Sequence, residues 1–490
     1  MRLFPMSSGH ARARLVQAGA VLFAVALVAG CGSQYRPVVT PINPSGPAAQ
    51  PQSFAIVVSA PSPTSPGIAT IIDYAGDSVM AQAPIGLGPT AFSVDETGTT
   101  GYTVNSDGTL TDFPVSTSLQ AKQINFITLP PTAQPVNLFS PSAGLWISDL
   151  DGNIADVLTG NPATFKLAIP VAPLPVAVAG PGVIGQRNFI ISQNLPVSSA
   201  VACNISPSKV SVNGEADAIE TSSDTVSSHI PLGKCPVYGV SSNDQRRFFV
   251  LNRGSDTITV INSQDNTLDS CTPFVNQNGQ TVTCHPSLPL SSAAGLTGAN
   301  VPAVAGPVYA EYNSATSQLV VANYDGNTIS VIDVSLDQYG NDSPTFGSTF
   351  TIPVGANPAS VTVLADGSRA YTANQTDGTV TIVNLTSHTV EKTLPVNGHP
   401  RTVVSTQNSS FGKVYVASPD SPYLSILRTD QDIVDTTILL EGNVVDVRVS
   451  TQNGTSGNSN NTSRKPGYGQ PCNLPGAAAA STLIACQTLP

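Results

Sequence analysis

The sequence has few charged side chains. Asp, Glu, Lys and Arg make up only 10% of its 490 residues, a composition that suits strands and turns better than exposed amphipathic helices. A surface helix needs a charged or polar face opposite an apolar stripe, and no such 3.6-residue pattern persists beyond the first thirty residues. The net charge of −11 also disfavours nucleic acid as a partner, because phosphate binding requires concentrated Lys and Arg.

The sequence also lacks the motifs of common catalytic and cofactor sites. It contains only five His, and no two of those beyond the leader lie at metal-ligand spacing. Cys-x-x-Cys, Cys-x-x-Cys-His, Gly-x-Ser-x-Gly, phosphate loops and dinucleotide fingerprints are all missing. We therefore expect no metal and no cofactor, and favour a function other than catalysis.

Residues 1–30 have the features of a secretory signal peptide. Basic residues come first, and an apolar run from Leu15 to Ala29 follows, which is too short for a good membrane span. The run ends in Val-Ala-Gly before Cys31, which resembles a bacterial lipobox. The resemblance implies cleavage before Cys31 and lipidation of its thiol, with the outer membrane favoured because Gly32 rather than Asp follows. The alternative is an ordinary signal peptide with an incidental Cys.

The segments that flank the central part have a different composition. Residues 31–53 are rich in Pro and poor in bulky apolar residues, which predicts an extended tether. Residues 451–490 return to polar low complexity, and we expect a flexible tail there. The folded domain is therefore expected at residues 54–450.

A repeated unit organises this domain. Gln318–Asp333 and Arg369–Asn384 each consist of two alternating apolar strands around an Asn/Asp/Gly turn, the pattern of an antiparallel hairpin. Between them, Pro358–Val363 predicts a third strand. Recurrence of such a unit at a spacing of about fifty residues indicates small sheets repeated around an axis.

The segments Pro358–Asp366, Ala370–Asn374 and Thr379–Asn384 resemble the tyrosine-valine-threonine-asparagine (YVTN) repeat of bacterial β-propellers. The resemblance extends over roughly residues 54–450 and implies an all-β propeller of four-stranded blades. It implies little about function, because propellers support many unrelated activities.

Eight units can be counted from the strand that ends in Asn or its substitute and the strand that follows it. In the fourth unit these strands are predicted at Asn188–Asn194 and Lys209–Val212. Seven blades are the alternative if that unit is an elaborated loop. The opening strand is missing before Phe54 and appears instead at Gly442–Val449, which predicts that the C-terminal strand completes the first blade and closes the ring.

Cysteine usage predicts disulfides. Besides Cys31 there are six cysteines, an even number in an exported chain. Short separations favour Cys271 with Cys284 and Cys472 with Cys486, which leaves Cys203 with Cys235.

Propeller topology indicates where a ligand would bind. The turn before each Pro-opened strand and the turn after each Asn-ended strand should share one face near the central channel. We expect a mixed-charge funnel on this face, although solvated turn residues are the simpler interpretation. The candidate residues are Lys234, Arg253, Tyr324, Asp325, His399 and Arg401.

Three functions remain open. The leading hypothesis is a lipid-anchored binding or scaffolding module of the cell envelope, facing the periplasm or the cell surface, with a protein, peptide or glycan partner. The second is an enzyme similar to the propeller lactonases, with no catalytic residue assigned. The third is a surface-layer or adhesion protein.

Overall fold

A computed structural model describes residues 54–95, 97–140, 144–150, 152–180, 187–242, 244–276 and 279–450. The chain divides into two units, residues 1–50 and 51–490, and the described residues belong to the second. The predicted signal peptide, Cys31, the tether and the tail with Cys472 and Cys486 lie outside the described residues.

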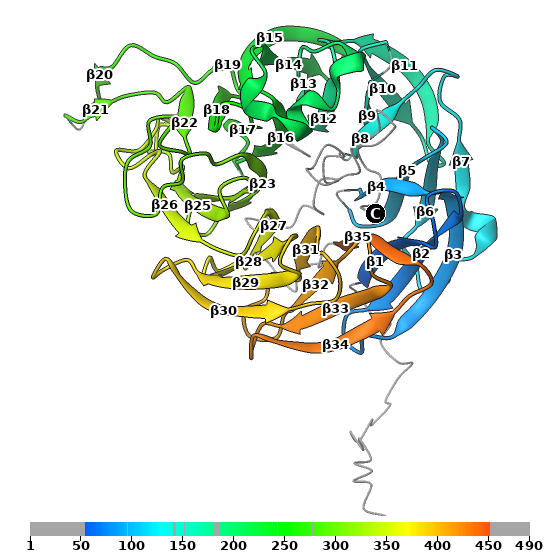
Figure 1. Ribbon diagram of the computed structural model, residues 1–490. Coiled ribbons are helices and arrows are strands. Elements are labelled where there is room, and N and C mark those ends of the chain that lie inside the picture. The colour runs from blue at the N-terminus through cyan, green and yellow to red at the C-terminus, as the bar shows by residue number, and fades with distance from the viewer. Residues whose placement is uncertain are drawn as a thin grey trace, which may run out of the picture. The chain divides into compact units, whose positions relative to one another are not determined.

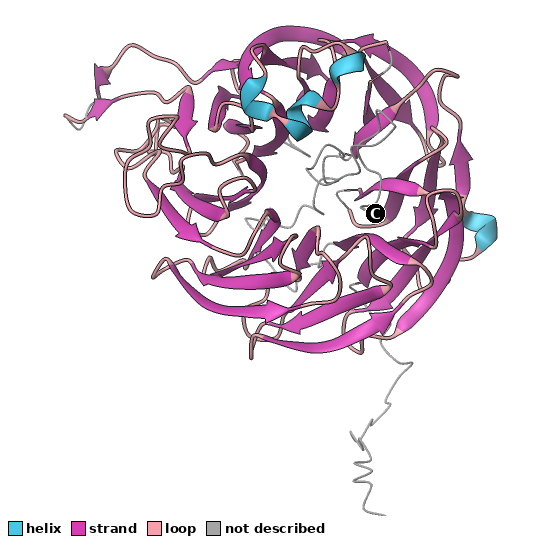
Figure 2. Ribbon diagram, in the orientation of Figure 1, coloured by secondary structure: helices cyan, strands magenta, loops and turns pink. Residues whose placement is uncertain are grey.

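The described strands form eight small antiparallel sheets arranged as the blades of a β-propeller (Figures 1 and 2). From the innermost strand outward, blade 1 is β35 (Asn443–Val449), β1 (Phe54–Ala60), β2 (Pro66–Asp73) and β3 (Val79–Leu87). Blade 2 is β4 (Pro89–Val94), β5 (Thr100–Asn105), β6 (Leu110–Pro114) and β7 (Asn125–Ile127). Blade 3 is β8 (Pro135–Phe139), β9 (Leu145–Asp149), β10 (Ile154–Thr159) and β11 (Thr164–Pro170). Blade 4 is β12 (Pro175–Ala179), β13 (Arg187–Ser192), β14 (Asn213–Glu220) and β15 (Thr225–Lys234).

The second half of the ring repeats the pattern. Blade 5 is β16 (Pro236–Ser241), β17 (Arg247–Asn252), β18 (Thr257–Asn262) and β19 (Thr267–Leu268), and β22 (Ser287–Pro289) also pairs with β18. Blade 6 is β23 (Pro307–Asn313), β24 (Gln318–Asn323), β25 (Thr328–Asp333) and β26 (Thr349–Pro353). Blade 7 is β27 (Pro358–Val363), β28 (Arg369–Asn374), β29 (Thr379–Asn384) and β30 (Thr389–Pro395). Blade 8 is β31 (Thr402–Ser405), β32 (Lys413–Ala417), β33 (Tyr423–Arg428) and β34 (Ile433–Leu439). A separate hairpin, β20 (Phe274–Val275) and β21 (Thr281–Val282), projects away from the ring (Figure 1).

The recurring Asn stabilises the hairpin of its own blade. In blade 7 the Asn374 side-chain amide donates to the hydroxyls of Thr379 and Thr381, at 3.0 and 2.8 Å. Asn323 and Asn252 make the same pair of bonds in blades 6 and 5. Asn374 is fully buried between blades, where an unsatisfied amide would be costly, so each Asn needs hydroxyl partners on the next strand.

The predicted closure of the ring is confirmed. β35 pairs antiparallel with β1, from Ala55 opposite Val449 to Ala60 opposite Asn443. Val444, Val445 and Val447 are buried. The N-terminal and C-terminal parts of the described chain therefore share blade 1, and the number of blades is eight rather than seven.

The strand predicted at Lys209–Val212 in blade 4 is wrong. The segment after β13 forms short helices, η2 (Val197–Ser199), α2 (Ala202–Ile205) and η3 (Pro207–Lys209), and the third strand of the blade is β14. Gly214, Ala216 and Ala218 of β14 are small and buried. Because none of them is β-branched or aromatic, the residue types that usually indicate a strand are missing at these positions. In β13, Ser192 takes the place of the recurring Asn. It lies opposite Pro175 in the same way that Asn252 lies opposite Pro236 in blade 5.

Only short helices occur in the described residues; besides the three in blade 4, there is η1 (Ala121–Gln123). Among these residues no helix has the length and apolarity needed to span a membrane.

Candidate functional site

The two kinds of turn predicted to share a face do so. The Arg253 and Gly254 amides, in the turn after β17, donate to the carbonyls of Cys235 and Lys234, which precede β16. Tyr324 N–H donates in the same way to Gly306, before β23. We call this end of the blades the Asn-turn face, defined by the turns after β5, β9, β17, β24 and β28.

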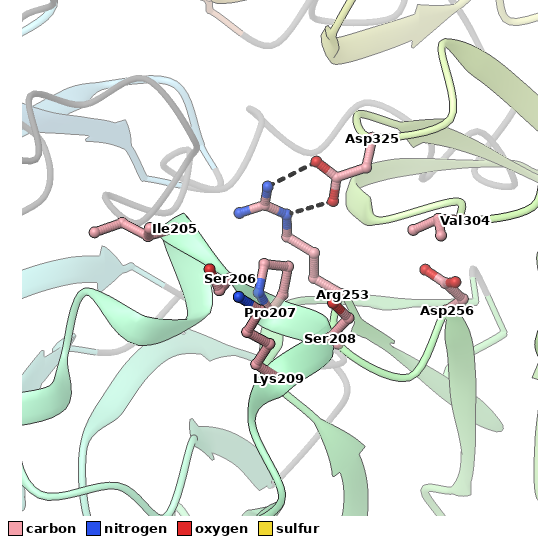
Figure 3. A pocket seen from close by; sticks show the side chains of 10 residues that line it. Ile205, Ser206, Pro207, Ser208, Lys209, Arg253, Asp256, Val304 and Asp325 are labelled. Atoms are coloured by element: carbon pink, nitrogen blue, oxygen red, sulfur yellow. Dashed lines mark hydrogen bonds and ion pairs between the residues drawn. The ribbon is translucent and has the colours of Figure 1, made fainter.

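Arg253 joins three parts of the Asn-turn face. Its Nε and Nη2 donate to Oδ2 and Oδ1 of Asp325 at 3.0 and 2.8 Å, a bidentate ion pair between blades 5 and 6 (Figure 3). Its Nη1 donates to the carbonyls of Cys203 and Asn204 at 3.0 and 3.1 Å, where short helix α2 has carbonyls without helical partners. The guanidinium also lies 5.5 Å from the centre of the Tyr324 ring.

Tyr324 is buried behind this ion pair. Its hydroxyl donates to Gln375 Oε1 at 3.1 Å. Burial raises the pKa of Tyr324 to about 12, although the Arg253 charge acts in the opposite direction. Tyr324 is therefore neutral at physiological pH, and it supports Arg253 rather than acting as an acid or base.

A cavity of about 230 Å³ opens beside the ion pair. One wall is the helical segment of blade 4, and the other consists of turn residues from blades 5 and 6 (Figure 3). Its lining residues are Ile205, Ser206, Pro207, Ser208, Lys209, Arg253, Gly254, Asp256, Val304 and Asp325.

The charged groups around the cavity differ in whether other residues of the protein already bind them through hydrogen bonds or ion pairs. Asp256 accepts hydrogen bonds from Gly306 N–H at 2.8 Å and from the Ser291 hydroxyl at 3.0 Å, so it holds the wall. Arg253 and Asp325 neutralise each other. Lys209 is exposed, and its side-chain ammonium makes no hydrogen bond or ion pair with any other described residue. The cavity therefore offers a cation beside the apolar side chains of Ile205, Pro207 and Val304.

The disulfide Cys203–Cys235 fixes the helical wall. It links α2 to the residue before β16, with the two Cα atoms 5.4 Å apart. Together with the Arg253 bonds to α2, it attaches the wall to blade 5 at two points. These links hold the wall of the cavity in place against blade 5.

The six residues proposed for the funnel do not form a single site. Arg253, Tyr324 and Asp325 come together, whereas Lys234 lies next to Gly254 outside the lining. His399 is exposed and its Nδ1 contacts Asp420 Oδ2 at 2.5 Å. Arg401 is buried, and burial lowers its pKa while Asp446 raises it.

Most residues that line the cavity could not be predicted from the sequence. Lys209 is the first residue of the strand predicted at Lys209–Val212, Ile205 to Ser208 precede that strand, and Val304 lies between blades. The available signals were the long interval before Asn252 and the presence of Cys203 within it. Both indicated an elaborated connection, but neither indicated its shape.

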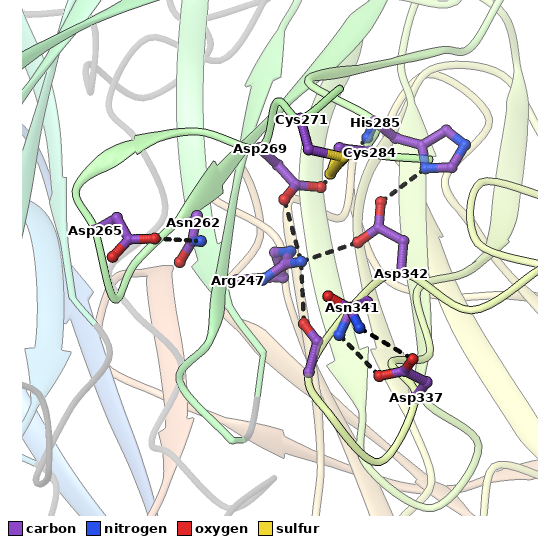
Figure 4. The surroundings of a disulfide bond; sticks show 11 residues. Arg247, Asn262, Asp265, Asp269, Cys271, Cys284, His285, Asp337, Asn341 and Asp342 are labelled. Carbon is purple, nitrogen blue, oxygen red and sulfur yellow. Dashed lines mark hydrogen bonds and ion pairs between the residues drawn. A yellow bond between two sulfur atoms is a disulfide. The ribbon is translucent and has the colours of Figure 1, made fainter. Parts of the chain in front are cut away.

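A second disulfide, Cys271–Cys284, lies in a different polar cluster (Figure 4). Buried Arg247 forms ion pairs with Asp269 and Asp342 at 3.1 and 3.0 Å, and His285 Nδ1 lies 2.7 Å from Asp342 Oδ2. Burial raises the pKa of Asp269 to about 6, and the Arg247 charge opposes this rise. The cluster ties the two long insertions of blades 5 and 6 to each other, so we assign it a structural role.

Both described disulfides match pairings expected from the sequence. Disulfides persist in oxidising compartments, so they indicate an extracellular or periplasmic protein.

The fold places the chain among the eight-bladed β-propellers. No protein-family model matches the sequence, and no curated protein matches it. Among solved structures, the chain is similar to AztD from Citrobacter koseri in its apo form, with 13% identity, a TM-score of 0.54, and 81% of this chain and 97% of that chain covered. A second AztD structure from the same organism has 11% identity and a TM-score of 0.54, with 83% and 99% covered. The dihydro-heme d1 dehydrogenase NirN has 14% identity and a TM-score of 0.53, with 81% and 76% covered. At these identities the likeness establishes the fold alone.

Proposed function

We propose that the protein is an exported, lipid-anchored binding module of the cell envelope, and that its ligand enters the cavity on the Asn-turn face. The observation that carries the proposal is the cavity itself. One of its walls is attached to blade 5 by the Cys203–Cys235 disulfide and by hydrogen bonds from Arg253. Lys209 in this wall is exposed and forms no ion pair with a described side chain. A wall that is held in place avoids the entropic cost of ordering its own loops on binding.

The lining indicates the class of ligand. Lys209 supplies an ammonium for an anion, and Ser208 lies next to it with a hydroxyl. Ile205 and Val304 are exposed apolar residues on opposite walls, 61% and 43% accessible. A carboxylate next to a small apolar group satisfies both features, and the C-terminus of a peptide or protein with an apolar last residue has this chemistry.

Binding of short peptides tests this proposal. Peptides ending in Val or Leu with a free carboxylate should bind the mature chain, and their C-terminal amides should bind at least about fivefold more weakly, as expected for the loss of roughly 1 kcal/mol. Lys209→Ala should remove the preference for the free carboxylate. Fluorescence anisotropy with labelled peptides measures both effects.

Lys122→Ala is the matched control, because Lys122 is an exposed lysine on the short helix η1 of another blade. It should bind like the unaltered protein. Equal affinity for acid and amide peptides, or an unchanged preference in Lys209→Ala, would refute the assignment of the cavity.

The anchor is supported by the sequence before the propeller. Val-Ala-Gly precedes Cys31, and the Pro-rich residues 32–53 provide a spacer between the membrane and the first strand. We expect the Cys31→Ser protein to fractionate with soluble periplasmic or secreted proteins, whereas the unaltered protein requires detergent for extraction. Detergent phase partitioning followed by immunoblotting distinguishes the two. A detergent requirement that persists in Cys31→Ser would contradict the anchor.

A further inference from the structure

A group of potential metal ligands lies on the outer strands of blade 4, away from the residues that line the cavity. Asp217 on β14 lies directly opposite His229 on β15, and Glu215 is two residues from Asp217 on the same face of β14. His229 Nδ1 is 2.5 Å from Asp217 Oδ1 and 3.0 Å from Glu215 Oε1. One ligand atom from each residue lies within 4.8 Å of the other two.

The charge of this group is not balanced by any fixed cation. Asp217 is fully buried, yet no described Lys or Arg forms an ion pair with Asp217 or Glu215, and His229 is their sole ion-pair partner in the described chain. A buried carboxylate is costly unless it is paired or coordinates a metal. A neutral imidazole would leave two negative charges next to each other, a situation that a bound divalent cation would relieve.

The group also has the support and access expected of a metal site. Asp217 Oδ2 accepts the Ala172 N–H at 2.6 Å, which fixes the carboxylate and leaves Oδ1 for a metal. The side chain of His229 is 65% accessible and that of Glu215 is 30% accessible. Ligand atoms around a tetrahedral zinc ion lie about 3.4 Å apart, so the contacts of His229 Nδ1 with Asp217 and Glu215, at 2.5 and 3.0 Å, would need to lengthen only slightly.

We propose that Glu215, Asp217 and His229 bind a divalent transition-metal cation such as Zn²⁺, with a fourth position open to solvent. The imidazole donor favours Zn²⁺ and its neighbours in the first transition row over Ca²⁺ and Mg²⁺, which prefer oxygen donors alone. The sequence predicts no metal because no two His lie at metal-ligand spacing and no Cys-x-x-Cys motif occurs, whereas this group combines one His with two carboxylates. The register of β14 and β15 brings them together.

The proposal does not depend on the cavity or on the lipid anchor. It is tested by isothermal titration of Zn²⁺ into the mature chain, purified without a polyhistidine tag. We expect one site, with affinity reduced at least about tenfold in both His229→Ala and Glu215→Gln, and with no comparable binding of Ca²⁺. Glu215→Gln leaves the His229–Asp217 pair intact and should fold normally, and circular dichroism checks the fold of His229→Ala, which removes the ion-pair partner of buried Asp217.

His399→Ala is the matched control. The His399–Asp420 pair also has a 2.5 Å contact at an exposed position, but no third potential ligand lies next to it among the described residues. Zinc affinity should be unchanged in this variant. Absence of zinc binding by the unaltered protein would overturn the proposal, and so would equal zinc affinity in His229→Ala and the unaltered protein.

Discussion

Truncation after Leu440 is expected to prevent stable folding, whereas truncation after Ser450 should leave the free energy of unfolding nearly unchanged. The shorter chain lacks β35, the innermost strand of blade 1. It loses the ladder along β1 from Ala55 to Ala60 and the burial of Val444, Val445, Val447 and Val449. At about 1.5 kcal/mol for each buried Val, with about 0.5–1.5 kcal/mol for each ladder hydrogen bond, the loss is comparable to the whole stability of a typical domain.

Thermal unfolding followed by circular dichroism, with size-exclusion chromatography of both truncated proteins, measures this difference. The protein ending at Leu440 should aggregate, because β1 becomes an exposed edge strand. The protein ending at Ser450 retains every described strand and serves as the control. If both proteins melt at the same temperature, β35 does not hold the ring closed.

Asp156→Asn is expected to stabilise the protein above pH 7. Asp156 and its neighbour Asp149 occupy positions in blade 3 where blade 7 has the hydroxyl of Thr381 and the amide of Asn374. Burial, together with the smaller effect of the neighbouring Asp149, raises the pKa of Asp156 from 3.8 to about 7. Asp156 in blade 3 is therefore protonated below about pH 7, at the position where blade 7 has a hydrogen bond between neutral groups.

The sign of the pH effect follows from this raised pKa. Unfolded Asp156 ionises near pH 4, so the stability that its protonated form contributes is complete below pH 4 and is lost as the pH rises to about 7. Asn keeps a neutral donor that faces Asp149 at every pH. The free energy of unfolding of Asp156→Asn should therefore differ little from that of the unaltered protein at pH 4 and exceed it by roughly 2–4 kcal/mol at pH 8.5.

Urea unfolding at pH 4, 6 and 8.5 measures the difference. Asp112→Asn is the control, because buried Asp112 accepts hydrogen bonds from the Ala163 N–H and the Asn125 amide. Replacing one of its acceptor oxygens with an amide should destabilise the protein at pH 8.5. An Asp156→Asn protein with no gain at pH 8.5 would show that the two carboxyl groups of blade 3 do not share a buried site.

The parts of the fold that could be predicted from the sequence are those specified locally. β24 with β25 and β28 with β29 begin and end with the predicted hairpins Gln318–Asp333 and Arg369–Asn384, because each hairpin has alternating apolar residues and an Asn before its turn. β35 was identified because an alternating strand lacked a hairpin partner. β14 was missed because Ala216 and Ala218 owe their strand conformation to packing against neighbours rather than to their own propensity.

The candidate site was predicted only in part for the same reason. Arg253, Tyr324 and Asp325 follow recurring Asn positions, so the repeat placed them on one face. Lys209 reaches the cavity because Cys203–Cys235 and Arg253 fold a helical insertion onto the next blade. That contact is absent from the repeat and depends on the tertiary structure.

Blade 1 combines the first three described strands with the last one, and this limits the order in which the protein can fold. Phe54 and Ser450 exchange a hydrogen bond across 396 positions of sequence, so blade 1 cannot be completed until nearly the entire propeller sequence has crossed the membrane. Blades 2 to 8 use consecutive strands and can form in order as the chain emerges. Until β35 is available, β1, β2 and β3 can form only a three-stranded sheet with an open edge. An open edge of this kind is exposed to pairing with other chains until β35 completes the blade.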